Sequence, residues 1–293
     1  MDRSEFAIRV EAVLELGALG DFLGSPLEGM SIQDRRLDVT SGVLTDDTVF
    51  TFATARAIAD SGEVDPAKIA DCLLQEFQAG VPGIGSSTLG AMQALAAGQH
   101  WALSGISGDR AAGNGAAMRI APVAFVLDPS DAGERQLVLD IARITHRNDE
   151  AVTGALALVI GIRLALEGLT DGSSSLACIA EMLPDTRVRD AIVDASNFGP
   201  KSALEAAEEL GSSGHVSESV PLALYLGLSQ CDSAVDCIEA AVLASEDADT
   251  VGSMVGQLLG AAGHRLPVGS PVREHLPDDL PQLSRKIADT GVT

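Results

Sequence analysis

The chain has 293 residues, of which 46% are hydrophobic, so it can bury a substantial core without disulfides or oligomerisation. Its 42 acidic residues outnumber the 19 basic ones and give a net charge of −23, which repels nucleic-acid phosphates and anionic membranes. We therefore expect neither a nucleic-acid partner nor a membrane. Thirty glycines and many alanines, against 3% aromatic residues, indicate helices packed through small side chains and predict an all-α fold.

The first predicted helix follows Ser4, a favourable N-cap, covers residues 5–20 and ends near residues 24–29. A second helix begins around residues 45–48 and stops at Gly62, and Asp65 with Pro66 starts a third. Two later segments each consist of a glycine-rich loop that enters a helix, namely residues 79–98 and 111–127.

Further apolar segments with helical periodicity follow down the chain. They predict helices over residues 134–146, 149–168, 202–211, 219–228, 232–245 and 248–264. We find no sustained period-two alternation, no strict repeat and no long linker. Residues 1–293 are therefore predicted to form one compact domain.

The cysteines and the N-terminus bear on the cellular compartment. Cys72, Cys178, Cys231 and Cys237 lack C-x-x-C spacing and are too few for a disulfide scaffold, which predicts reduced thiols. The N-terminus opens with charged residues and lacks the basic stretch and apolar run of a signal peptide. No apolar segment is long enough to span a bilayer. We expect a cytoplasmic protein.

Two acidic clusters precede apolar helices. Thr45, Asp46, Asp47 and Thr48 form the first, and by itself helix capping explains it at least as well as a ligand site does. The second cluster comes about 200 residues later and changes this balance. It consists of Asp247, Asp249 and Thr250.

Bringing the two clusters together would be costly unless cations lay between the carboxylates. Their oxygen-only donors favour Mg²⁺ or Mn²⁺ over zinc. Bound cations would also supply the local positive charge that an anionic substrate needs in so acidic a protein.

Six motifs, in this order, resemble the ADP-ribosylglycohydrolase family, which includes the dinitrogenase reductase-activating glycohydrolases. They are GALGDFLGSPLEG, LTDDT, GIGSST, GNGAAMRIAPV, THRNDEAVTGA and DADTVGSMVGQLLGA. The resemblance covers nearly the whole chain. It implies a compact orthogonal helical bundle that holds two divalent cations, Mg²⁺ or Mn²⁺.

The resemblance also assigns roles to residues of both acidic clusters. The implied metal ligands are Thr45, Asp46, Asp47, Asp247, Asp249 and Thr250. Glu28 matches an early acidic position beside the metals, whereas by itself it would be an exposed loop carboxylate. Glu28 and Asp47 are the candidate catalytic residues for proton relay, and the sequence does not choose between them.

The glycine-rich segments resemble the family's walls for ADP-ribose, where backbone amides approach the pyrophosphate. Without the resemblance, each would more simply be a helix connection. The expected substrate-binding residues are Gly83, Gly85, Ser86 and Thr88 on one wall, Gly113, Asn114, Gly115 and Met118 on the other, and His146 nearby. For His146 the simpler alternative is a helix C-cap; for Asn114 it is a local turn.

The chain departs from the family pattern at several positions. Glu246 stands where relatives commonly carry glycine and adds a charge beside the metals. Ala111 and Ala112 precede GNG where some relatives carry an aromatic that stacks on adenine. Trp101 and Tyr225 are the few aromatic substitutes to consider.

The resemblance implies hydrolysis of the glycosidic bond of an ADP-ribosyl group on a protein side chain or a small molecule, releasing ADP-ribose. Such a reaction passes through an oxocarbenium-like state and needs an activated water and a proton relay. Two alternatives remain open: a two-metal hydrolase of another phosphorylated substrate, and a non-catalytic ADP-ribose-binding or structural relative. The sequence does not identify the acceptor that carries the ADP-ribosyl group.

Overall fold

The computed structural model describes residues 1–291, and within them α-helices supply almost all of the regular structure. The long helices are α1 (Arg3–Gly24), α2 (Asp46–Ser61), α3 (Pro66–Ala79), α4 (Ser86–Ala96), α6 (Ala132–Arg143), α7 (Asp149–Leu166), α8 (Gly172–Glu181), α9 (Arg187–Ser196), α10 (Ala203–Leu210), α11 (Val216–Gly227), α12 (Ala234–Ala244), α13 (Ala248–Ala262) and α14 (Leu280–Thr290). The all-α prediction is confirmed.

The remaining elements are short. They are the helix α5 (Trp101–Ser104), the 3₁₀ helices η1 (Ser25–Leu27), η2 (Ile32–Asp34), η3 (Asp109–Ala111), η4 (Ala121–Phe125) and η5 (Pro271–His275), and the parallel strands β1 (Ile106–Ser107) and β2 (His146–Arg147).

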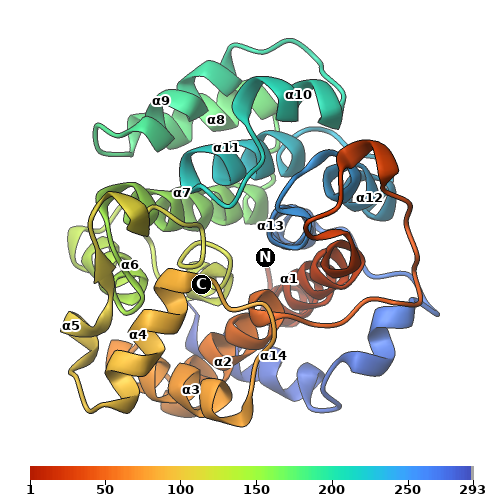
Figure 1. Cartoon of the computed structure of the whole chain (residues 1–293). Helices are drawn as coiled ribbons and strands as arrows, with labels where there is room; N and C mark the ends of the chain where they lie inside the picture. The colour runs from red at the N-terminus through yellow and green to blue at the C-terminus, as the bar shows by residue number, and fades with distance from the viewer. Residues whose placement is uncertain (292–293) are drawn as a thin grey trace.

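Helices α1 and α13 lie side by side at the centre of the molecule (Figure 1). Their backbones touch, because a Cβ atom added at Gly20 would lie 2.1 Å from the carbonyl carbon of Gly252. Further along α1, a Cβ added at Gly24 would lie 2.3 Å from the backbone nitrogen of Asp249. Glycine at these positions therefore lets α1 press against the first turn of α13, which carries part of the late acidic cluster.

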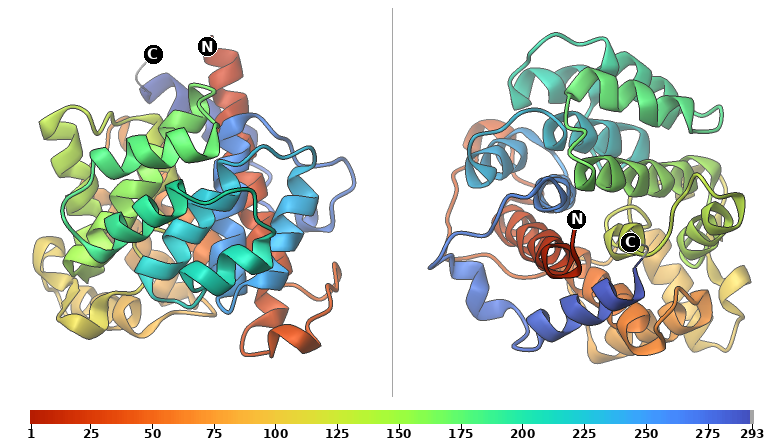
Figure 2. Two further views of the ribbon diagram at one scale, coloured as in Figure 1. Left: turned by 90° about the horizontal axis from the view of Figure 1, so that it is seen from above. Right: turned by 180° about the vertical axis from the view of Figure 1, so that it is seen from behind.

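The other helices surround this pair (Figure 2). α7 and α11 pack against α13 on one side and in turn contact α8, α9 and α10. On the other side, α2 and α14 pack against α1, and α3 packs against α2 (Figure 1). One contiguous cluster of buried apolar side chains extends through all of these layers. The first turn of α2 and the first turn of α13 both contribute side chains to the cavity that forms the candidate site.

Several predicted helix boundaries were wrong. Asp2, not Ser4, caps α1, because its carboxylate accepts the backbone N–H of Glu5. The segment 111–127 enters no α-helix: it forms turns and η4, where Pro122 stands near the start. The helix predicted over residues 134–146 ends at Arg143, and the chain continues into β2. α8, α9 and α14 were not predicted at all.

The prediction of four reduced thiols was wrong for two of them. Cys231 and Cys237 form a disulfide, whereas Cys72 and Cys178 are free. Cys231 precedes α12 and Cys237 lies in its first turns, so the loop that enters the helix brings the two sulfurs together. Spacing rules for zinc sites and disulfide scaffolds do not detect such a short local crosslink.

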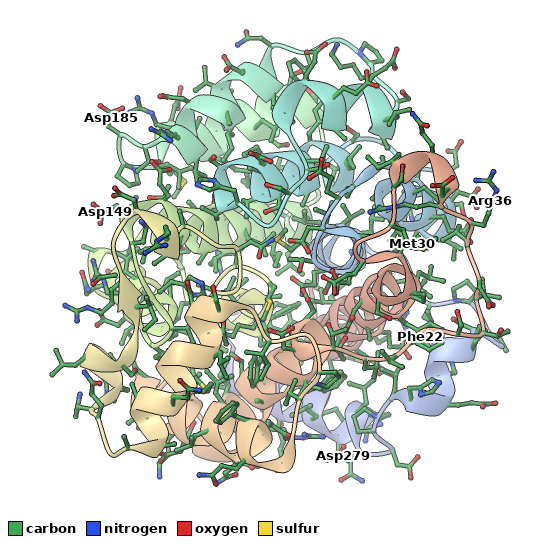
Figure 3. The ribbon with its side chains drawn as sticks, in the orientation of Figure 1. Phe22, Met30, Arg36, Asp149, Asp185 and Asp279 are labelled. Atoms are coloured by element: carbon green, nitrogen blue, oxygen red, sulfur yellow. A yellow bond between two sulfur atoms is a disulfide. The ribbon has the colours of Figure 1, made fainter. Side chains whose placement is uncertain are left out.

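The surface carries the charge that the composition indicates. Asp149, Asp185 and Asp279 are exposed and lie on the outside of the molecule (Figure 3). Within residues 1–291, no helix is long and apolar enough to cross a membrane.

Candidate active site

The first acidic cluster is held in place by Asp21, a fully buried residue of α1. Its carboxylate accepts the backbone N–H and the hydroxyl of Thr45, both at 2.9 Å, and the backbone N–H of Thr48 at 3.2 Å. The Thr48 hydroxyl also donates to it. Burial raises the pKa of Asp21 to about 6, although these four hydrogen bonds favour its charged form. Asp21 thus fixes the start of α2 against α1.

This arrangement distinguishes Thr45 from the other expected ligands. Its hydroxyl donates to Asp21 and accepts the backbone N–H of Asp47, so Thr45 acts as the N-cap of α2. It does not line the cavity described below. Thr45 therefore caps the helix, as the simpler alternative proposed, whereas Asp46 and Asp47 beside it line the cavity.

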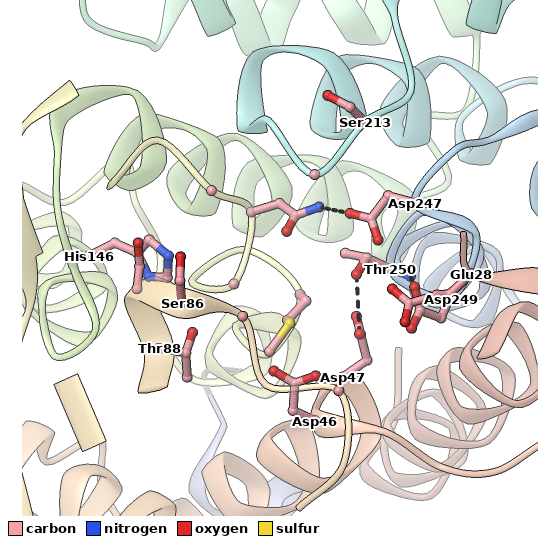
Figure 4. A pocket seen from close by; sticks show the side chains of 18 of the residues that line it. Glu28, Asp46, Asp47, Ser86, Thr88, His146, Ser213, Asp247, Asp249 and Thr250 are labelled. Atoms are coloured by element: carbon pink, nitrogen blue, oxygen red, sulfur yellow. Dashed lines mark hydrogen bonds between the residues drawn. The ribbon is translucent and has the colours of Figure 1, made fainter. Parts of the chain in front are cut away.

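Asp47 connects the two clusters, which are about 200 residues apart in sequence. Its Oδ2 accepts the hydroxyl of Thr250 at 3.1 Å, a contact that is visible in Figure 4. Its Oδ1 is buried and has no hydrogen-bond partner among residues 1–291. Burying a carboxylate oxygen without a donor costs free energy, so we expect Oδ1 of Asp47 to bind a group that is not part of the chain.

The late cluster meets Glu28 at the same place. One oxygen each of Glu28, Asp247 and Asp249 lies within 4.8 Å of the others. Asp247 occupies the N-cap position of α13 without capping it, and its carboxylate lines the cavity instead. Glu28 is exposed and follows η1, so it reaches the cluster from the rim (Figure 4).

Arg35 fastens the Glu28 loop to the late cluster. Its guanidinium is 3% exposed and donates to the carbonyls of Met30, Val242, Ser245 and Glu246. The segment that follows Glu28 is therefore tied to the segment that leads into α13.

Burial and mutual repulsion raise the pKa of several of these carboxyls. Burial, followed by the charge of Asp21, raises the pKa of Asp46 to about 7. Burial, followed by the charges of Asp247 and Glu28, raises the pKa of Asp249 to about 9. Burial, followed by the charge of Asp249, holds the pKa of Asp47 well above its ordinary value. Such a cluster fits divalent cations, which would neutralise it.

The carboxylates stand at one end of a cavity of about 420 Å³. The remaining walls come from the loop before α4, the GNG loop and the loop before α11, with His146 at the other side (Figure 4). The lining residues are Glu28, Asp46, Asp47, Gly83, Gly85, Ser86, Ser87, Thr88, Arg110, Gly113, Asn114, Gly115, Met118, His146, Ser213, Gly214, Glu246, Asp247, Asp249 and Thr250. Every residue expected at the site except Thr45 is among them.

Asn114 has a different set of contacts from the one expected. Its side-chain amide donates to Oδ2 of Asp247 at 2.6 Å and to the hydroxyl of Ser219 at 3.1 Å. The GNG loop is thereby bonded directly to the late acidic cluster. Neither a place in the wall for ADP-ribose nor a local turn, the two interpretations of the sequence, includes this contact with a carboxylate.

Sequence reasoning missed several lining or supporting residues, among them Asp21, Arg35, Ser87, Arg110, Ser213 and Gly214. Asp21 had a detectable signal, since it is the one charged residue in the apolar stretch 16–23 of α1. Arg110 contributes the one Lys or Arg side chain among the lining residues, while Ser213 and Gly214 form a third wall with no motif of their own. Trp101 and Tyr225 do not line the cavity: Trp101 packs beside His100, and Tyr225 against Phe198.

Comparison with known proteins assigns this arrangement to a family. The sequence model described as ADP-ribosylglycohydrolase matches residues 2–291. The chain belongs to the ADP-ribosylglycohydrolase family. An uncharacterized protein of Archaeoglobus fulgidus is 30% identical over 267 residues, which are 85% of this chain and 86% of that protein.

Two further similarities add to this. The ADP-ribosylarginine hydrolase Tri1 of Pseudomonas putida is 29% identical over 261 residues, covering 83% of this chain and 67% of Tri1. A solved structure titled ADP-ribosylglycohydrolase-related protein complex superposes with a TM-score of 0.78 at 22% identity, over 99% of this chain and all of that one. The latter similarity supports the fold alone.

Proposed function

We propose that this ADP-ribosylglycohydrolase family member hydrolyses the glycosidic bond of an ADP-ribosyl group and depends on Mg²⁺ or Mn²⁺. The observation that carries the proposal is the convergence of carboxylates from α2 and α13, together with Glu28, at one end of a cavity whose other walls are glycine-rich loops. The orphaned Oδ1 of Asp47 supports the presence of cations there. The ADP-ribosylated substrate class is also that of the relative Tri1, by its name.

In this proposal the cations are held by Asp46, Asp47, Asp247, Asp249 and Thr250. When bound, two such ions supply positive charge that orients the ribose hydroxyls and lowers the pKa of a water. Glu28 is the proton relay. It reaches the cluster from the exposed rim, and partial burial together with the charge of Asp247 raises its pKa, so it holds a proton more readily than an ordinary glutamate.

Asp47 is the weaker candidate for that relay. Its side chain is 2% exposed: Oδ2 accepts the Thr250 hydroxyl and Oδ1 is buried, so neither oxygen exchanges a proton with solvent as readily as the exposed Glu28. We therefore assign Asp47 to cation binding.

The remaining walls would bind the ADP-ribosyl group. A Cβ added at Gly115 would lie 2.8 Å from the Thr88 hydroxyl, so glycine keeps the two loops close while leaving room in the cavity. Arg110 would offset the acidity for an incoming pyrophosphate. The exposed carboxylates of Glu28 and Glu246 at the rim suit a cationic leaving group, so ADP-ribosylated arginine is the first acceptor to test.

Product analysis with Mg²⁺ or Mn²⁺ tests the proposal. Incubation with ADP-ribosylated arginine, ADP-ribosylated serine and ADP-ribosyl metabolites should release free ADP-ribose from at least one of them. AMP as the product would instead establish hydrolysis of the pyrophosphate bond, and inorganic phosphate released from phosphate monoesters offered in parallel would establish a phosphatase. ADP-ribose binding with turnover of none of these substrates would establish a non-catalytic relative.

A further inference from the structure

His146 lies on the side of the cavity away from the carboxylates (Figure 4). Its backbone is held by the parallel pairing of β1 with β2, and the Ile106 N–H donates to the carbonyl of Thr145 at 3.0 Å. A Cβ added at Gly113 would lie 3.5 Å from Nε2 of the ring, so the GNG loop faces that edge of the imidazole. Within residues 1–291, Nε2 makes no hydrogen bond. It is the ring nitrogen available to a ligand.

The other ring nitrogen ends a buried chain of polar groups. Arg119 follows the GNG loop, is fully buried, and donates from Nη2 to the hydroxyl oxygen of Thr145 at 2.7 Å and to the carbonyl of Ile141 at 3.2 Å. The same Thr145 hydroxyl lies 2.9 Å from Nδ1 of His146. All three side chains are 2% exposed or less.

The direction of each hydrogen bond in this chain follows from chemistry. A guanidinium has donors and no acceptor, so the Thr145 oxygen must accept from Arg119. The single proton of the hydroxyl still needs an acceptor, and the remaining contact of the hydroxyl among residues 1–291 is Nδ1 of His146. A neutral imidazole that accepts at Nδ1 carries its proton at Nε2. The opposite direction would leave the buried hydroxyl proton without an acceptor, which costs free energy.

We propose that Arg119 and Thr145 are positioning residues that fix His146 as the neutral Nε2–H tautomer, so that this wall offers a ligand an N–H donor. The donor suits a phosphate or ribose oxygen of the ADP-ribosyl group. That choice of ligand rests on the proposed function, whereas the tautomer does not.

The electrostatics agree with the hydrogen-bond geometry. Burial, followed by the charge of Arg119, lowers the pKa of His146 to about 3. The pKa of Arg119 is itself lowered by burial, to about 10, so the guanidinium stays charged at neutral pH. His146 is then neutral in the working range and donates a hydrogen bond without relaying a proton, which leaves that task to the carboxylate end.

The tautomer is measured directly in the unsubstituted protein. Long-range ¹H–¹⁵N correlation spectra of protein labelled at its five histidines distinguish the two tautomers and the imidazolium, and His146→Gln identifies the signals of His146. The expected spectrum shows a protonated Nε2 and an unprotonated, hydrogen-bonded Nδ1 at neutral pH. A protonated Nδ1, a mixture of tautomers or an imidazolium would overturn the proposal.

Thr145→Val and Thr145→Ser test the positioning role, because serine keeps the hydroxyl that valine lacks. Thr145→Val should raise the dissociation constant for ADP-ribose about three- to tenfold, the effect of one hydrogen bond, and leave the Mg²⁺ affinity unchanged. Thr145→Ser should retain the affinity for ADP-ribose and the wild-type spectrum of His146. Wild-type ADP-ribose affinity in Thr145→Val would refute the positioning role.

Failure of the proposed function gives a different result. If the unsubstituted protein binds Mg²⁺ but not ADP-ribose, the ligand assignment falls with the proposed function. The spectrum of His146 then still decides whether Arg119 and Thr145 fix the tautomer.

Discussion

The two ends of the cavity differ in where their polar groups find partners. At the carboxylate end, Asp46, Asp47 and Asp249 are buried close together, and Oδ1 of Asp47 has no partner among residues 1–291. At the opposite end, Thr145 gives His146 a partner at Nδ1 from within the chain. The first end thus holds a buried carboxylate oxygen without a donor, whereas at the second end Nδ1 of His146 already has its partner within the chain. Metal removal and substitution should therefore affect the two ends separately.

The largest effect is expected from Asp249→Asn. The substitution keeps the shape of the side chain but removes one of the charges that hold a cation, so it should weaken Mg²⁺ binding and reduce turnover about 100-fold or more. Helical content should stay largely intact, since the amide also relieves repulsion from Asp247 and Glu28. Calorimetry, circular dichroism and turnover at low Mg²⁺ measure these quantities.

A matched control is Asp71→Asn, which removes one exposed carboxylate from the middle of α3. It should bind Mg²⁺ and turn over substrate as the wild type does. If Asp249→Asn keeps wild-type turnover at low Mg²⁺, Asp249 has no place in the cation site.

The second prediction concerns pH and metal. Because the folded-state pKa of Asp46 is about 7 and that of Asp249 about 9, against an ordinary 3.8, the folded chain holds protons that the unfolded chain has released. Without metal, the free energy of unfolding should fall as pH rises from about 4 to about 9. Mg²⁺ at 100 times its dissociation constant should restore about 2.7 kcal/mol at neutral pH. Thermal unfolding with chelator and with Mg²⁺, across this pH range, measures both effects.

Asp249→Asn serves as the control here as well, because it should flatten the pH dependence of the metal-free protein. Stability that stays constant or rises with pH, in chelator, would contradict the carboxylate repulsion described for this end of the cavity. A protein whose unfolding temperature ignores Mg²⁺ and Mn²⁺ would refute the cation site itself.

The sequence predicted the helical class and most of the residues around the cavity, because both leave local signals. Apolar periodicity marks α2, α7 and α13, and two separated Asp–Thr clusters are unusual enough to suggest a common ligand. The single-domain assignment for residues 1–293 stays a prediction. The helices that were missed include α9, which is polar on its outer face, and α14, whose apolar residues follow closely spaced prolines.

What the sequence could not give was the pairing of side chains across long separations. Asp21 binds Thr45 and Thr48, and Asn114 binds Asp247, but nothing in the spacing of these residues indicates which polar group each one meets. Motif order places residues at a site and leaves their partners undetermined. For this reason the motifs place Thr45 and Asn114 at the site but do not indicate that Thr45 binds Asp21 or that Asn114 binds Asp247.

The third prediction concerns Asn114, the residue that connects the two ends. Because its amide donates to Asp247, Asn114→Ala should weaken Mg²⁺ binding about tenfold and also weaken ADP-ribose binding, so the two ends should not separate in this variant. Titration of Mg²⁺ and of ADP-ribose into the same preparation measures both. Asn197→Ala, which changes an exposed asparagine after α9, should alter neither. An unchanged Mg²⁺ affinity would show that the contact with Asp247 does not support the cation site.

The smallest effect is expected from Arg110→Ala, in the wall of the cavity. Arg110 is exposed and contributes the one Lys or Arg side chain among the lining residues. Its attraction for an anionic ligand is therefore weakened by water and salt. ADP-ribose affinity should fall about three- to tenfold, and the remaining affinity should depend less on salt concentration. Arg36→Ala removes an equal charge from a residue outside the cavity and should leave the affinity unchanged. Equal losses in both variants would mean that Arg110 acts through the net charge of the protein and not from the wall of the cavity.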